Sequence, residues 1–249
     1  MPGSPPPLEL LHPRPVTALS REELADVYAW PRELTVRFNF VSGLDGAATI
    51  RGRSGDLGSP ADRCVFELLR RTADVILVGS GTVRTEGYAG PLLASEPAAR
   101  SAEPGHPLHP AVAYLSRRLQ LDPEAPAFRD AAVRPLVFTT AAADPRRRKA
   151  LEPVADVVTA GGTDVDPRRV VRILSDAGHR RILCEGGPRV FGSFEAAEAV
   201  DELCLSLSPL LTAGSGPRLS AGAPETVSPM RLRSVIRAGD MLLLRYTRR

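Results

Sequence analysis

The segment 74–82, DVILVGSGT, is the feature that most restricts how this chain can fold. Its run of consecutive apolar residues has no polar face, which indicates a strand that is buried on both sides. Such a strand needs helices above and below its sheet, as in parallel α/β domains. The glycines at the end of the run allow the chain to turn tightly and to approach a ligand closely.

From residue 34 onward, strand patterns alternate with helix patterns. We predict strands at 34–41, 74–82, 111–116, 135–140, 154–160, 181–187 and 201–211, and helices at 60–73, 167–177 and 188–199. The segments MRLRSVIR and MLLLRYT are joined by Ala238-Gly239-Asp240, which predicts a C-terminal hairpin. We therefore expect an α/β fold with a mostly parallel sheet, helices on both faces and an antiparallel hairpin at its edge.

Local signals mark the ends of several helices and the less regular parts of the chain. Ser20 and Glu23 form a capping box for a short helix over 21–29, and Ser59-Pro60 opens the helix at 60–73. The first 19 residues are proline-rich and are expected to be irregular, and 89–110 is expected to be a loop. We expect an N-terminal extension at 1–32 and a single domain at 33–249, because no internal repeat or second core is evident.

The composition is ordinary for a globular protein, with 43% hydrophobic and 24% charged residues and a formal net charge of +3. No apolar run approaches the roughly 18 residues of a membrane span. The start of the chain lacks the basic-then-apolar layout of a signal peptide, so we expect a cytoplasmic protein. The basic run at 144–152 has no interleaved aromatic residues, which favours a solvated helix face over a nucleic-acid site.

Cysteine and histidine are too sparse to predict a metal site or a disulfide framework. Cys64, Cys184 and Cys204 lie far apart in apolar contexts and are predicted to be buried free thiols. None of the four histidines stands in the H-x-E and P-C-x-x-C pattern of a zinc deaminase. We expect no bound metal.

Three predicted strand ends carry glycines, in SGLDGAAT (42–49), VGSGTVR (78–84) and CEGGPRV (184–190). Ligands of open α/β sheets bind beyond the carboxyl ends of the strands, and a following helix offers free N–H groups to a phosphate. Arg84 stands where the dinucleotide fingerprint of a Rossmann fold has its third glycine, which disfavours that fold. Each corner alone is also compatible with a simple tight turn.

A fourth strand end, in YLSRRL (114–119), carries Ser116 and Arg117. An arginine beside a hydroxyl suits a phosphate monoester such as the 2′-phosphate of NADPH. An exposed basic loop is the alternative for this segment.

In combination, FNFVSGLDGAAT, ELLRRTADVILVGSGTVRTEGY and LCEGGPRVFGSFEAAEAVDELCLSLSPLLTAGSG resemble the reductase domain of riboflavin biosynthesis. That domain is the carboxy-terminal half of the bifunctional pyrimidine deaminase–reductase and has a dihydrofolate-reductase-like fold. The resemblance covers roughly residues 33 to 247. It implies an NADPH-dependent reductase, usually a homodimer, that transfers hydride to the ribose C1′ of a ribosylaminopyrimidine.

The resemblance also implies roles for individual residues. The implied catalytic residues are Asn39, Glu86 and Glu185. The implied substrate-binding residues are Asn39, Leu44, Asp45 and Gly46. The implied cofactor-binding residues are Gly79, Gly81, Thr82, Val83, Ser116, Arg117, Gly186, Gly187, Pro188 and Arg189.

Hydride transfer to an imine or an opened sugar also needs a proton donor near the reacting atom. A carboxyl group whose pKa is raised by burial can supply that proton. Glu86 and Glu185 are the candidates. The alternatives are a solvent-exposed loop acid for Glu86 and a charge partner of a helix N-terminus for Glu185.

The segment RTEGYAGPLL (84–93) departs from the riboflavin reductases, which continue with an acid pair, a proline and an L-T-x-R arginine that grips the substrate phosphate. Tyr88 can stack on a flat ring or serve in packing. The substrate therefore stays open between a riboflavin intermediate and a pteridine of the dihydrofolate type. A non-catalytic NADPH-binding module and a nucleic-acid binder are the competing classes of function.

Overall fold

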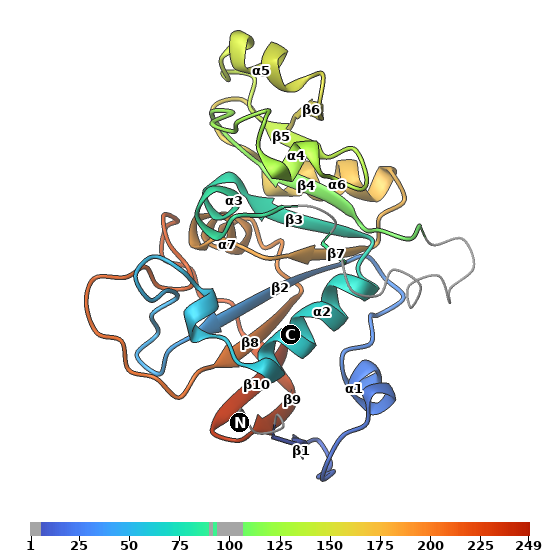
Figure 1. Ribbon diagram of the computed structural model, residues 1–249, viewed down its shortest axis with the longest axis vertical. Coiled ribbons are helices and arrows are strands. Elements are labelled where there is room, and N and C mark those ends of the chain that lie inside the picture. Colours follow the sequence, from blue (N-terminus) through green and yellow to red (C-terminus); the bar gives the residue numbers. More distant parts are fainter. Residues whose placement is uncertain (1–5, 90–91, 94–106) are drawn as a thin grey trace.

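Ten strands form one sheet in the order β1-β9-β10-β8-β2-β7-β3-β4-β5-β6 (Figure 1). The computed structural model describes residues 6–89, 92–93 and 107–249, so most of the loop predicted at 89–110 lies outside the described residues. The strands are β1 Leu8–His12, β2 Thr35–Ser42, β3 Val75–Gly79, β4 Ala111–Leu115, β5 Leu136–Thr139, β6 Asp156–Thr159, β7 Arg181–Cys184, β8 Glu202–Leu207, β9 Met230–Ala238 and β10 Met241–Arg248.

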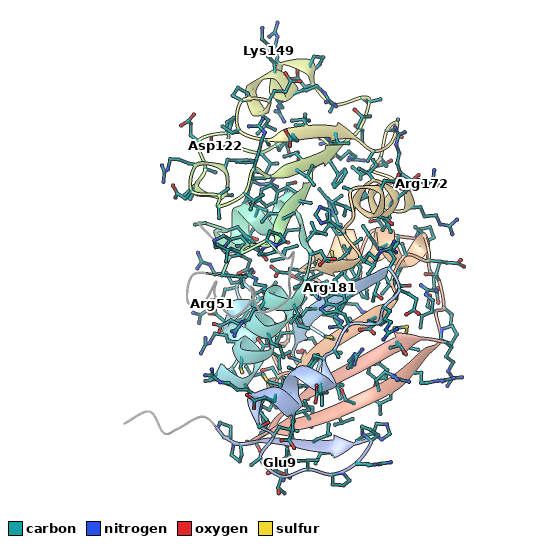
Figure 2. All side chains as sticks on the ribbon, turned by 90° about the vertical axis from the view of Figure 1, so that its right-hand side faces the viewer. Glu9, Arg51, Asp122, Lys149, Arg172 and Arg181 are labelled. Carbon is teal, nitrogen blue, oxygen red and sulfur yellow. The ribbon has the colours of Figure 1, made fainter. Side chains whose placement is uncertain are left out.

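The sheet is mostly parallel, as the alternation of strands and helices predicts. Strands β8, β2, β7, β3, β4, β5 and β6 run parallel, whereas β10 pairs antiparallel with β8 and β9. The predicted hairpin is therefore confirmed as β9–β10, with its turn at residues 239–240. The long sheet gives the molecule an elongated outline, with Lys149 at one end and Glu9 at the other (Figure 2).

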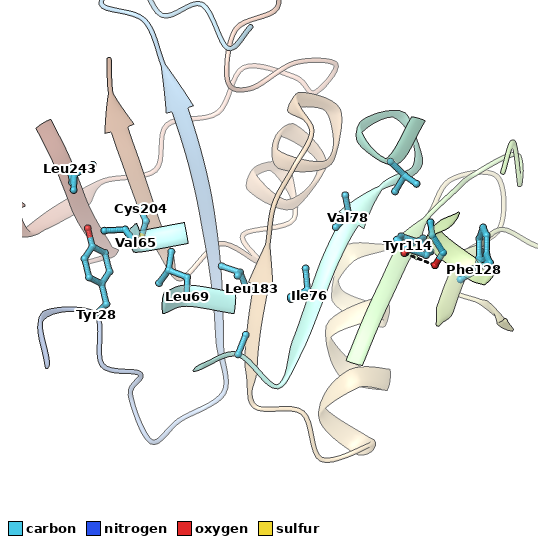
Figure 3. Packing of buried hydrophobic residues seen from close by; sticks show 14 of the residues in the cluster. Tyr28, Val65, Leu69, Ile76, Val78, Tyr114, Phe128, Leu183, Cys204 and Leu243 are labelled. Atoms are coloured by element: carbon cyan, nitrogen blue, oxygen red, sulfur yellow. Dashed lines mark hydrogen bonds between the residues drawn. The ribbon is translucent and has the colours of Figure 1, made fainter. Parts of the chain in front are cut away.

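Helices cover both faces of this sheet, which confirms the predicted layers. The helices are α1 Arg21–Val27, α2 Pro60–Thr72, α3 Ser80–Glu86, α4 Pro126–Arg129, α5 Pro145–Leu151, α6 Pro167–Asp176 and α7 Pro188–Ala196, with a 3₁₀ turn η1 at Gly55–Leu57. On one face, Val65 and Leu69 of α2 pack with Ile76 and Leu183 of the sheet (Figure 3). On the other face, α6 and α7 pack against a second cluster that contains Phe38, Leu77, Val170, Leu174, Ile182, Phe191 and Phe194.

The local helix signals are confirmed in the structure. The Ser20 hydroxyl accepts from the amide of Glu23, whose carboxylate accepts from the Ser20 amide. Ser59 caps α2 through the amide of Asp62. The predicted strand at 74–82 is shorter than expected, because the chain enters α3 directly after Gly79.

The expectation that residues 1–19 are irregular is wrong for residues 8–12, which form β1, and holds for residues 13–19. Strand β1 pairs antiparallel with β9, with Leu8 opposite Ala238 and Leu10 opposite Ile236. This pairing satisfies backbone groups that would otherwise be open at the β9 edge. A partner more than 200 residues away overrides the local proline content.

A buried charge network holds α1 against the sheet. Glu202 accepts from Arg37 at 2.6 Å and from Arg245 at 2.8 Å. Both arginines also donate to backbone carbonyls of residues 27–29, where α1 ends. The Arg37 guanidinium lies 3.9 Å from the centre of the Trp30 ring. The extension at residues 8–30 is thus joined to the same sheet as the rest of the chain.

The predicted state of the cysteines is only partly confirmed. Cys184 and Cys204 are buried free thiols, but Cys64 is exposed on α2. The helix turns its apolar stripe of Ala61, Val65 and Leu69 toward the sheet, and Cys64 lies outside this stripe.

Candidate active site

The glycine-bearing strand ends lie at one edge of the sheet. Strands β2, β7, β3 and β4 are successive parallel neighbours, so their carboxyl ends point the same way. Two corners contact each other directly, because the amide of Gly79 donates to the carbonyl of Gly186 at 2.7 Å. In Figure 1, α3 and α7 begin side by side at this edge. The structure therefore brings the Gly79 and Gly186 corners together.

Side chains at these glycines would collide with the neighbouring corner. A Cβ on Gly79 would lie 2.8 Å from Val190, and one on Gly187 would lie 2.8 Å from the hydroxyl of Thr82. Gly186 has φ +89°, and a Cβ there would lie 2.8 Å from the Phe40 ring. The Gly186–Gly187 peptide is cis. The two corners pack closely because these positions lack side chains, and α7 begins directly after them at Pro188.

Gly81, like Gly46 but unlike Gly79, Gly186 and Gly187, has no atom within 4 Å of a Cβ built on it. Thr82 and Val83 follow it in α3, and Val83 is buried in the core. Pro188 is the first residue of α7, and Arg189 after it is exposed.

Ser116 and Arg117 lie at the end of β4, next to β3. The Ser116 side chain is buried, and the Arg117 guanidinium donates to Asp164 at 2.8 Å. Both members of this ion pair are largely exposed, so the pair contributes little to stability and Arg117 can exchange Asp164 for another anion.

Asp45 organises the loop at the end of β2. Its carboxylate accepts from the amides of Thr212 and Ala213, each at 2.8 Å. These bonds lower the pKa of Asp45. Leu44 beside it is 55% exposed, and Gly46 has φ +80°. The predicted substrate wall is thus a surface loop that Asp45 ties to residues 210–213.

Glu185 is held by two side chains that the sequence did not connect with it. Arg70 of α2 donates to both carboxylate oxygens at 2.7 Å, and the Tyr88 hydroxyl donates to Oε2 at 2.5 Å. Burial, and then the Glu185 charge, raises the pKa of Tyr88 well above its ordinary value, so Tyr88 keeps its proton. Both carboxylate oxygens of Glu185 are thus engaged by Arg70 and Tyr88.

Glu86 and Asn39 lie apart from this cluster of Arg70, Tyr88 and Glu185. The Glu86 carboxylate accepts from the amide of Ser54 at 2.8 Å and from its hydroxyl at 3.0 Å. It therefore ties the end of α3 to the loop before α2. Asn39 is partly buried on β2, and its side chain makes no hydrogen bond within the described ranges of the chain.

A model of the RibD C-terminal domain family matches residues 34–244. The chain belongs to this family. It is 30% identical over 227 residues to the 2,5-diamino-6-ribosylamino-4(3H)-pyrimidinone 5′-phosphate reductase of Methanothermobacter thermautotrophicus, which covers 85% of this chain and 97% of that protein. It is also 30% identical over 190 residues to the riboflavin biosynthesis protein RibD of Bacillus amyloliquefaciens. That match covers 75% of this chain but only 49% of the relative, so the chain spans about half of its length.

The RibD C-terminal fold is also seen in solved structures. The crystal structure of a pyrimidine reductase-like protein from Corynebacterium diphtheriae superposes with a TM-score of 0.79, at 24% identity, over 91% of this chain and 98% of that chain. This similarity establishes the common fold.

The segment 84–93, which differs in sequence from the riboflavin reductases, contributes Tyr88 to the core. Tyr88 packs against the core and donates to Glu185 of the E-G-G-P motif, so of its two predicted roles the packing role holds. The sequence analysis did not identify Arg70 of α2 as the partner of Glu185. Residues 90–91 of the segment lie outside the described part of the chain.

Sequence reasoning also passed over Asp62, the third residue of α2. Its Oδ1 accepts from the Ser206 hydroxyl of β8 at 2.5 Å, and burial raises its pKa above the ordinary value. In the sequence, Ser59-Pro60 predicts only the start of a helix. The available signal was an acid placed directly after Ala61, the first residue of the buried stripe of α2.

The described residues show neither a membrane helix nor a metal cluster. No helix among them combines the length and the apolar character needed to cross a bilayer. Within the same ranges, no group of three or more His, Cys, Asp or Glu side chains is arranged to hold a metal ion.

Proposed function

We propose that this RibD C-terminal domain protein is an NADPH-dependent reductase acting on a ribosylaminopyrimidine 5′-phosphate or a closely related heterocycle. The observation that carries the proposal is the contact between the Gly79 and Gly186 corners at the carboxyl edge of the sheet. The name of the archaeal relative, matched over nearly its whole length, supports the substrate class. Residues 33–249 would form the reductase domain, with 1–32 as an extension that completes its edge.

The corners fit the proposed cofactor. Gly79, Gly186 and Gly187 leave no room for a Cβ, so the two corners pack closely at the strand ends, where the N-terminus of α7 would face a pyrophosphate. Thr82 and the first turn of α7 would bind the phosphates, and Ser116 with Arg117 would bind the 2′-phosphate. NADPH supplies the hydride, and the chain supplies orientation and exclusion of water.

The loop at Leu44, Asp45 and Gly46 would bound the substrate on the other side, with Asn39 offering a free amide to the heterocycle. Asp45 would act by holding the loop, since its carboxylate is already used by the amides of residues 212–213. Glu185 would position the E-G-G-P corner through Arg70 and Tyr88. By resemblance to the family, we propose a cytoplasmic homodimer, which light scattering at several protein concentrations would test.

The deciding experiment follows NADPH absorbance with purified protein and three substrates. These are the aminated and the deaminated ribosylaminopyrimidine 5′-phosphates and dihydrofolate. We expect oxidation of NADPH with a ribosylaminopyrimidine. Turnover of dihydrofolate alone would replace the substrate assignment, and NADPH binding without any turnover would identify a non-catalytic module.

A further inference from the structure

Helix α2 places one carboxyl group beside the proposed substrate site that no role yet explains. Asp62 accepts from Ser206 at 2.5 Å, and Ser206 stands opposite Val41 in the pairing of β8 with β2. Asn39 precedes Val41 by two residues and therefore faces the same side of the sheet. Asp62 and Asn39 thus lie on one face, close to the strand end that opens into the Leu44–Gly46 loop.

Asp62 has no cation paired with it among the residues that the structure describes. Its neighbours are the Ser206 hydroxyl from β8, the Tyr28 phenol that follows α1, and Arg63 on its own helix, whose charge acts at longer range. Glu185 and Glu202, in contrast, are paired with arginines. Burial is the dominant effect on Asp62 and raises its pKa, so its protonated form is favoured relative to an ordinary aspartate.

A structural role for Asp62 in the helix does not account for this arrangement. An acid at the third helical position stabilises a helix dipole when it is ionised and solvated, but this one is directed at β8. The N-cap function already belongs to Ser59. An asparagine would accept the same Ser206 hydrogen bond without the free-energy cost of burying a titratable group.

We propose that Asp62 donates the proton in the reduction, an inference that rests on the proposed function. Glu86 is engaged by Ser54 and Glu185 by Arg70, whereas Asp62 is hydrogen-bonded to the neutral Ser206 hydroxyl. The opened ribosylamine is an imine: its carbon accepts the hydride and the C=N double bond becomes single. The imine nitrogen takes the Asp62 proton, NADPH becomes NADP⁺, and water then returns a proton to the Asp62 carboxylate.

The test compares Asp62→Asn with the wild-type protein and with Asp176→Asn, an exposed acid at the end of α6 on the other face of the sheet. We expect Asp62→Asn to lower kcat by roughly 100-fold or more, while the NADPH dissociation constant stays within about twofold. The wild-type kcat should fall as pH rises through the Asp62 pKa, and the residual activity of Asp62→Asn should not follow that limb. Asp176→Asn should match the wild type.

Thermal stability across pH gives a readout that does not require turnover. A folded-state pKa above the unfolded value means that ionised Asp62 destabilises the fold. Its effect is absent below the unfolded pKa and complete above the folded pKa. Asp62→Asn should therefore melt above the wild type at pH 8, and the difference should vanish in acid.

Two outcomes would overturn the assignment: a kcat of Asp62→Asn within threefold of the wild type, or a stability difference that does not change with pH. A wild-type protein that binds NADPH and reduces no substrate would overturn the proposed function, and with it this proton transfer. If the wild type reduces the substrate and Asp62→Asn binds NADPH without reducing it, both the proposed function and the role of Asp62 are supported.

Discussion

Replacing Arg70 with methionine tests how the E-G-G-P corner is held. The guanidinium donates twice to Glu185, whose side chain is only 1% exposed. Methionine keeps an unbranched apolar stem beside Phe66 but removes the charge. The buried carboxylate would then lose both hydrogen bonds from Arg70 and keep the one from the Tyr88 hydroxyl.

Removal of one partner from a buried ion pair costs about 3–5 kcal/mol. The side chain of Arg70 is 15% exposed, so water can partly replace it, and we expect the lower end of that range. For a chain of this size each kcal/mol lowers the melting temperature by about 2–4 °C, which gives a decrease of about 6–12 °C.

The assay is thermal and guanidinium unfolding of a double-mutant cycle: Arg70→Met, Glu185→Gln and the double variant. The double variant should lose less stability than Arg70→Met alone, because a neutral amide needs no cation. Arg129→Met is the matched control, since Arg129 pairs with Asp130 on the surface, where water screens the pair, and its loss should leave stability almost unchanged. The reasoning is refuted if Arg70→Met is as stable as Arg129→Met, or if the two single effects simply add.

Three further predictions concern other parts of the molecule. Gly81→Ala should weaken NADPH binding in a fluorescence titration, because its Cβ enters the open space beside α3. The melting temperature should not fall, since alanine favours a helix by about 1 kcal/mol over glycine. Gly162→Ala is the control: its Cβ also enters open space, but after the end of β6, and this variant should bind NADPH normally. Ionised Asp45 should stabilise the fold above its ordinary pKa, and this effect should be lost as pH falls through the lowered folded-state pKa. In Asp45→Asn, the free energy of unfolding should therefore decrease less steeply in acid than in the wild type. Ser20→Ala should cost about 1 kcal/mol in denaturant unfolding, through loss of the capping box of α1.

Much of the fold was predictable because local patterns carry it. The run VILVG requires burial on both faces, and Pro60 and Pro167 can only stand at helix starts. These constraints act within one strand or one helical turn. The turn at Gly239, with φ +63°, likewise specifies the hairpin from a few neighbouring residues.

For the candidate site, the sequence predicted the glycine turns of the backbone but not the contacts of the side chains. The glycine corners could be read from the sequence because absence of a side chain is itself a local signal. The partners of the two acids predicted as proton donors could not be read from the sequence: Arg70 binds Glu185, and Ser54 binds Glu86. Neither partner is close in sequence to the acid that it binds.

The sequence by itself determined the alternation of strands and helices, the caps, the strand-end glycines and, through their combination, the family. Tertiary structure alone decided the pairing of β1 with β9, the arginine beside Glu185 and the serine hydroxyl beside Asp62. The physical reason is range. Burial periodicity and backbone freedom are properties of neighbouring residues, whereas the charge state and chemistry of an acid depend on which distant side chains share its low-dielectric surroundings.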